Sequence, residues 1–135
     1  NSIVVTARHC VEGLSASQIK VQMGVIRRGE TGVIETVSSI IQASKPSTVP
    51  YDSDIAILKL THLVDFTKNI FPVCVPPRAT KETFTGRTMT VSGFGDYDIY
   101  GHESSVLMKT EVVGMTDEDC LNIYGSKELT SNMMC

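Results

Sequence analysis

The feature that most constrains the fold is a series of short apolar stretches of β-type composition. Clusters of Gly, Pro, Ser and Asp separate these stretches, and such clusters mark turns. In "VLMKTEVV" the side chains follow a mixed period of two, which is typical of a strand in a barrel or sandwich wall. The sequence therefore predicts an all-β fold. The expected strands are Ser2–Ala7, Ile19–Gly24, Gly32–Ala43, Ile55–Leu60, Thr88–Gly93 and Val106–Val113.

One stretch, "TDEDCLNIYG", predicts a helix instead. Thr116 is a suitable N-cap, acidic residues follow it at the positive end of the helix dipole, and Gly125 suits the C-terminus. We expect a short helix at about 117–124. The proline-rich segment 71–83 cannot form a central strand, because proline has no backbone N–H to donate. It is expected to link two β units, 1–70 and 84–135.

Length, composition and charge limit the classes of function that the chain can have. The 135 residues, 41% hydrophobic and 20% charged, fit one globular domain of ordinary size. The net charge of −3 and the lack of a Lys/Arg run argue against nucleic-acid or membrane partners, which need a clustered basic face. No apolar stretch approaches the roughly 20 residues of a membrane helix. Because "NSIVVTA" starts within a strand pattern, we expect the chain to be part of a longer protein.

The chain has four cysteines, and no two of them have CxxC spacing. They are at positions 10, 74, 120 and 135. This argues against a zinc ribbon or a dithiol redox site and favours disulfides, hence an oxidising, extracellular setting. Four small buried thiols are the alternative. The absence of an N-x-[ST] acceptor means that glycosylation gives no independent support for secretion.

Two titratable residues stand beside expected strands. His9, in "VVTARHC", directly follows an apolar run, and by itself it could be a core residue, a metal ligand, a proton carrier or a loop residue. Asp54, in "YDSDIAILKL", begins an apolar strand that would carry it inward, where a carboxylate needs a partner. A turn residue at the strand end is the alternative for Asp54. Asp52, in the polar loop, is expected to be solvated.

Together these stretches resemble blocks of the chymotrypsin-type (trypsin-like) serine endopeptidases. "VVTARHC" is similar to the block that carries the catalytic His of that family, and "DSDIAILKL" to the block that carries its Asp, 45 residues later. "VSGFG" resembles the turn usually written V-S-G-W-G, and "MTDEDC…SNMMC" resembles the family's intermediate helix and the Cys-bearing strand after it. The blocks come in family order and cover nearly the whole chain.

The resemblance implies two six-stranded antiparallel β-barrels, incomplete here. Residues 1–70 would form the first barrel without its first strands, and 84–135 the opening part of the second, including the helix. The chain would be a middle segment of somewhat over half a protease domain. The resemblance also implies a secreted zymogen that acts on a polypeptide substrate without a cofactor, with a proteinase inhibitor as a further partner.

By the same resemblance, His9 is the general base and faces the cleft between the barrels, while Asp54 accepts a hydrogen bond from its other ring nitrogen. Imidazole suits this role because it titrates near neutral pH, and the carboxylate fixes its tautomer and stabilises the imidazolium. The family's nucleophile lies in a G-D-S-G-G block roughly a dozen residues past the position of Cys135. The fragment alone is therefore expected to be inactive. No serine of the chain has the glycine setting of that block. The following serines are interpreted as strand or loop residues: Ser92, Ser104, Ser105 and Ser126.

The family pattern also implies the disulfides. Cys120 would pair with Cys135, which closes a loop with 14 residues inside it. Cys10 would pair with a cysteine upstream of Asn1, and Cys74 with one in a propeptide or light chain. Neither of these partners is in the chain.

Several positions depart from the family pattern. Arg8 replaces a small residue and is expected to point into solvent, and Phe94 replaces the usual Trp but keeps a ring. The loop "MGVIRRGETG" would overlie the family's calcium loop, yet Val25 holds its first acidic ligand position. Glu30 and Glu35 alone cannot hold calcium, so we expect no metal and interpret them as a solvated loop charge and a strand-edge charge.

Two other functions stay open. A non-catalytic protease homologue could keep the barrels as a binding or cofactor module, since function lies in a site and not in the fold. A truncated segment with an interaction role would expose strand edges, which favour aggregation. Cleavage specificity depends on pocket residues beyond Cys135 and is not predicted.

Overall fold

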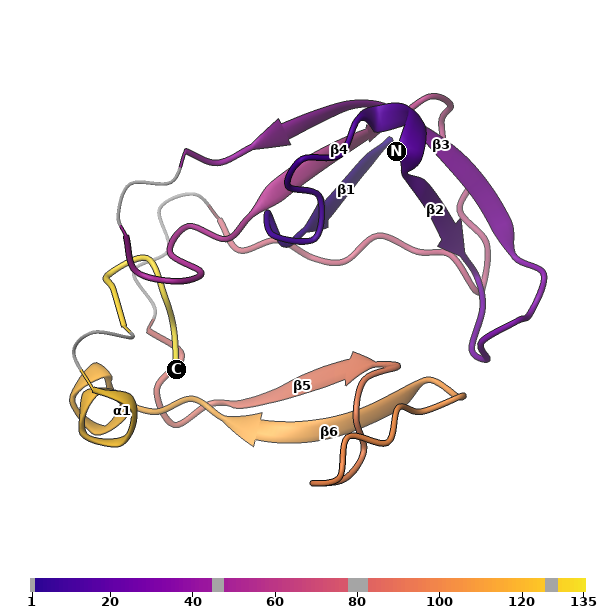
Figure 1. Cartoon of the computed structure of the whole chain (residues 1–135). Coiled ribbons are helices and arrows are strands. Elements are labelled where there is room, and N and C mark those ends of the chain that lie inside the picture. Colours follow the sequence, from indigo (N-terminus) through magenta and orange to yellow (C-terminus); the bar gives the residue numbers. More distant parts are fainter. Residues whose placement is uncertain (1, 45–47, 78–82, 126–128) are drawn as a thin grey trace.

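The computed structural model describes residues 2–44, 48–77, 83–125 and 129–135. A curved antiparallel sheet of four strands, in the order β1-β4-β3-β2, forms the first half, and β5 pairs with β6 in the second (Figure 1). A short 3-10 turn, Ala16–Gln18, precedes β2. The elements are β1 (Ile3–Thr6), β2 (Lys20–Met23), β3 (Val33–Gln42), β4 (Ala56–Leu60), β5 (Thr88–Gly93), β6 (Met108–Val113) and α1 (Asp117–Tyr124).

The all-β prediction is confirmed, with one short helix. Every expected strand is present, most of them a residue or two shorter than expected. The two closed barrels stay a prediction, because the described residues form a curved sheet and a separate pair of strands. Of the expected linker 71–83, residues 71–77 contain no strand, and 78–82 lie outside the described residues, as does Ser126.

The core lies on one face of β4. Because β4 is central in the sheet and side chains alternate along a strand, Ala56, Leu58 and Leu60 point inward and are 1%, 4% and 3% exposed. They pack with Val11 and Val37. The sheet is thereby fixed in register around the strand that follows Asp54.

The second half has little core of its own within the described residues. All six residues of β6 are exposed, and Cys120 of α1 is the buried apolar residue there. The helix begins and ends as the sequence predicts: the Thr116 hydroxyl accepts a hydrogen bond from Asp119 N, and Gly125 ends the helix at φ 85°. None of the helices among the described residues is long and apolar enough to cross a membrane.

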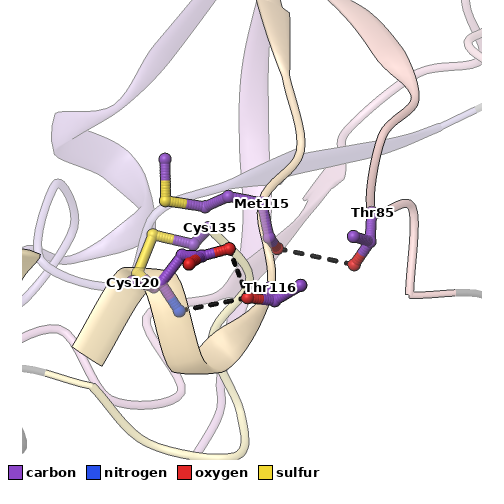
Figure 2. Close-up of a disulfide and its surroundings, with 6 residues drawn as sticks. Thr85, Met115, Thr116, Cys120 and Cys135 are labelled. Atoms are coloured by element: carbon purple, nitrogen blue, oxygen red, sulfur yellow. Dashed lines mark hydrogen bonds between the residues drawn. A yellow bond between two sulfur atoms is a disulfide. The ribbon is translucent and has the colours of Figure 1, made fainter. Parts of the chain in front are cut away.

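A disulfide joins α1 to the C-terminal segment 129–135. Cys120 and Cys135 are bonded with their Cα atoms 6.1 Å apart, within the usual range. Figure 2 shows the bond beside the hydrogen bond from Met115 N to Cys135 O, which is 3.0 Å long. These two links hold the C-terminal residue against the base of the helix.

The two halves also meet where the β2–β3 loop approaches the segment before β6. Leu107 N donates to Ile26 O at 2.8 Å, and Arg28 N donates to Ser105 O at 2.9 Å. The Arg28 side chain donates to Phe94 O at 2.7 Å and pairs with Glu103 at 2.9 Å. This loop therefore acts as a contact between the sheets.

Candidate active site

Strand pairing brings His9 and Asp54 together. His9 lies in the turn after β1, and Asp54 lies two residues before β4. Because β1 and β4 are antiparallel and Thr6 pairs with Ala56, the chain that leaves β1 meets the chain that enters β4. His9 and Asp54 are 45 positions apart in the sequence, and β2 and β3 lie between them, so the contact depends on the sheet and not on local sequence.

The Asp54 carboxylate binds His9 through both oxygens. Asp54 Oδ1 accepts from His9 N at 2.8 Å, and Asp54 Oδ2 lies 2.5 Å from His9 Nδ1. The Asp54 side chain is 14% exposed and the His9 side chain 52% exposed. The hydrogen bond from the ring, followed by that from the backbone N–H, holds the pKa of Asp54 below its ordinary value.

This arrangement assigns the ring protons. An ionised carboxylate can only accept hydrogen bonds, so His9 Nδ1 must donate to Asp54. In the neutral ring, Nε2 then carries the lone pair and can accept a proton. Nε2 lies 3.4 Å from the thiol sulfur of Cys10. Nε2, the ring nitrogen that does not face Asp54, is therefore the one that can act as a base.

Cys10 and Cys74 are exposed free thiols in the described part of the chain. The other two cysteines, Cys120 and Cys135, form the disulfide.

Asp52 was expected to be solvated, and this expectation is wrong. Its residue is 2% exposed, and its Oδ1 accepts hydrogen bonds from Thr130 Oγ1 at 2.7 Å and from Asn132 Nδ2 at 3.0 Å. The two donors lie 78 and 80 residues further along the chain. A polar loop in the sequence gives no sign of such distant partners.

Arg8 was expected to point into solvent, and it is buried instead, at 7% exposure. A tight turn, in which Val11 N donates to Arg8 O, brings Glu12 to the same side, and Arg8 Nη1 pairs with Glu12 Oε1 at 2.9 Å. Among the described residues, Arg8 Nε has no hydrogen-bond partner. Arg8 also contributes to the lowered pKa of Asp54, less than His9 does.

Glu30 and Glu35, interpreted from the sequence as a solvated loop charge and a strand-edge charge, both take part in contacts within the chain. Glu30 Oε2 accepts from Ile26 N at 2.9 Å and from Arg27 N at 3.1 Å, so this carboxylate organises the β2–β3 loop. The Glu35 side chain is 19% exposed and lies 3.1 Å from His62 Nδ1. Each carboxylate has a partner within the chain. In the ranges that the structure describes, no group of three His, Cys, Asp or Glu side chains could hold a metal ion.

Among the described residues, no serine is hydrogen-bonded to His9 or Asp54. Ser92 lies on β5, while Ser104 and Ser105 lie in the segment before β6. Ser104 is buried, and its hydroxyl donates to Val106 O at 2.7 Å. These are the strand and loop roles expected of them.

Tyr51 is a residue of the site that the sequence analysis did not identify. Its ring meets the His9 ring edge-on, with centroids 5.3 Å apart. Tyr51 and Ser53 both have left-handed backbone conformations, at φ 61° and 52°. The signal available in the sequence was the turn-forming "PYDSD", which does not show which way each side chain points.

Known proteins match this chain in sequence and in fold. A venom serine protease of Polistes dominula is 28% identical over 98% of the chain and 50% of its own length, and trypsin-1 of Astacus astacus is 33% identical over 97% of the chain and 56% of its own length. The chain thus spans about half of these relatives. A solved structure, the scabies mite inactivated protease paralogue S-D1, aligns with a TM-score of 0.85 at 18% identity, over 99% of the chain and 59% of that protein.

The family match covers the whole chain. The family model described as Trypsin matches residues 1–135. The match includes the β1 and β4 ends that hold His9 and Asp54, and α1 with its disulfide. The chain therefore belongs to the trypsin family of serine proteases.

Proposed function

We propose that the protein containing this chain is a serine-type endopeptidase in which His9 is the general base and Asp54 orients it. The observation that carries the proposal is the hydrogen bond of 2.5 Å between His9 Nδ1 and Asp54 Oδ2, together with the half-exposed His9 ring. The pair matches the base and the orienting carboxylate of a Ser-His-Asp triad.

The chemistry follows from the two nitrogens of His9. Nε2 takes the proton of a serine hydroxyl as that oxygen attacks the peptide carbonyl, and the imidazolium then gives the proton to the leaving amine. The ionised Asp54 stabilises the imidazolium and prevents the other tautomer, because it can only accept from Nδ1–H. The substrate of this reaction is a peptide bond of a polypeptide.

The nucleophilic serine of this proposal is outside the 135 residues, since none of their serines has a G-x-S-G setting. The protein is made as a secreted zymogen, and Cys74 joins its propeptide or light chain. The exposed, free state of Cys74 is compatible with such a partner. A relative named as a venom serine protease supports secretion.

The test compares variants of the full-length protein on peptide substrates. Asp54→Asn is expected to lower kcat by about three to four orders of magnitude, the typical loss for a triad member, because the neutral amide no longer fixes the tautomer. The matched control is His102→Ala. His102 also pairs with an aspartate, Asp98, at 2.6 Å, but it lies in the loop after β5. Full hydrolysis by Asp54→Asn would contradict the proposal.

A binding module without catalysis is the second candidate. The observation that favours a binding module is the shared fold with a mite protein that is named as an inactivated protease paralogue, at 18% identity. The retained His9–Asp54 pair favours catalysis instead. A folded full-length protein that hydrolyses no peptide would support the binding module.

A further inference from the structure

The buried Asp52 carboxylate lies between the two halves of the molecule. It is 2% exposed, and its Oδ1 accepts from Thr130 and Asn132 of the C-terminal segment. A buried carboxylate is unfavourable unless hydrogen bonds compensate it, so this contact fixes the loop before β4 against residues 129–135. The reaction chemistry proposed above makes no use of Asp52.

The loop that carries Asp52 has a strained backbone. Tyr51 and Ser53, on either side of Asp52, have φ of 61° and 52°, in the left-handed region that non-glycine residues rarely adopt. Such conformations persist where surrounding contacts hold them. The Asp52 side chain is the buried part of this turn, with exposed Tyr51 and partly exposed Ser53 beside it.

The strained turn sets two contacts of His9. On one side of Asp52, the Tyr51 ring lies edge-on to the imidazole at 5.3 Å. On the other side, Asp54 accepts from His9 N and faces His9 Nδ1. A rotation of the turn about Asp52 would therefore move both neighbours of the base.

The segment that holds Asp52 is itself fixed. Met133 N donates to Thr130 O at 3.1 Å, and Asn132 N donates to Thr130 Oγ1 at 3.3 Å, which makes a turn that aims both donors. Cys135 then ties this segment to α1 through the disulfide with Cys120, beside the bond from Met115 (Figure 2).

We propose that Asp52 is a positioning residue that transmits the fixed geometry of the disulfide-bonded C-terminal segment to the His9–Asp54 pair. The proposal rests on the proposed function for its kinetic consequence. Asp52 acts by holding the turn from Tyr51 to Asp54 through its hydrogen bonds to Thr130 and Asn132. The second half thus orients the general base carried by the first.

The test uses the full-length protein with Asp52→Ala and Asp52→Asn. Asp52→Ala removes the acceptor, and kcat on a peptide substrate is expected to fall by about 10- to 100-fold with little change in KM, because a small misplacement of the base slows chemistry. Asp52→Asn keeps an acceptor oxygen for both donors, so it is expected to restore kcat to within about threefold of the parent protein. Thr36→Val is the matched control.

The Thr36 hydroxyl donates a hydrogen bond to the Thr61 hydroxyl at 2.8 Å, at the end of β4 that lies away from Asp54. Thr36→Val therefore removes a side-chain hydrogen bond remote from His9. Thr130→Val removes one of the two hydrogen-bond donors to Asp52. It replaces Asp52→Ala in the test if that variant does not fold, and it is also expected to lower kcat. Equal kcat in the parent, Asp52→Ala and Thr130→Val would overturn the proposal. So would an Asp52→Asn variant as slow as Asp52→Ala.

A second readout separates this proposal from the proposed function. The proton on His9 Nδ1 that Asp54 binds should give a downfield, slowly exchanging NMR signal in the parent and in Asp52→Asn. We expect the signal to shift or broaden in Asp52→Ala, whether or not the protein hydrolyses peptides. An unchanged signal in Asp52→Ala would overturn the positioning role, whereas an inactive parent protein would overturn only the proposed function.

Discussion

At the scale of single residues, the molecule contains two similar His–Asp pairs in different settings. His9 meets Asp54 across two strand ends, and His102 meets Asp98 within one loop, with ring-to-carboxylate distances of 2.5 and 2.6 Å. In each pair the hydrogen bond from the ring is the largest cause that lowers the pKa of the carboxyl group. The two pairs therefore provide controls for each other.

His9→Ala should raise the pKa of Asp54 toward its ordinary value of 3.8, because the ring and its hydrogen bond are lost. The pKa of Asp98 should not change. In His102→Ala, the pKa of Asp98 should rise toward 3.8, while the pKa of Asp54 should not change. Carbon-13 NMR titration of the labelled aspartates measures both, and an Asp54 pKa that stays low in His9→Ala would show that another group holds it.

The sign of the pH effect follows from the same shift. A carboxyl group with a lowered pKa in the folded protein contributes stability that is present above the unfolded value of 3.8. That contribution is lost as the pH falls through the lowered pKa. The His9–Asp54 contact should thus weaken on the acid side, below pH 3.8.

Sequence alone located His9 and Asp54 because each lies at a strand end with a recognisable block around it. It misjudged Asp52 and Arg8 for a shared reason. Both look like loop polar residues, and their burial depends on a side chain's direction: Arg8 turns toward Glu12, and Asp52 toward donors 78 and 80 residues away. Local pattern carries no information on such directions.

At the scale of elements, β4 supports both the core and the site. Leu58→Ala should lower the free energy of unfolding of the full-length protein by about 2–5 kcal/mol, because it leaves a cavity at the centre of the sheet. Lys59→Ala, on the exposed face of the same strand, should change it by less than about 0.5 kcal/mol. Chemical denaturation measures both, and equal losses would contradict the assignment of the core face.

The elements were more predictable than their side-chain contacts. Strand positions follow from apolar runs and turn residues, and the helix from its cap at Thr116. The expected strand Val106–Val113 shortens to Met108–Val113 because Val106 and Leu107 pair with the β2–β3 loop. That partner lies in the other half of the chain, so its effect could not be inferred from the strand itself.

At the scale of the whole molecule, contacts at two separate places join the halves within the described residues. Arg28 links the β2–β3 loop to Phe94 and Glu103, and Asp52 links the loop before β4 to Thr130 and its neighbour. The Asp52 contact is buried and close to His9, whereas the Arg28 side chain is 49% exposed. A surface ion pair contributes little stability, so we assign the orientation of the base to Asp52.

The central claim is that His9 activates a serine nucleophile in the full-length protein, and labelling with a serine-reactive fluorophosphonate probe tests it most directly. The parent protein is expected to be labelled covalently at one serine. Labelling of His9→Ala should be at least about 10²-fold slower, since general-base assistance typically contributes that much. His102→Ala should label at the parent rate. A folded parent protein that takes up no probe, or a His9→Ala variant labelled as fast as the parent, would contradict the claim.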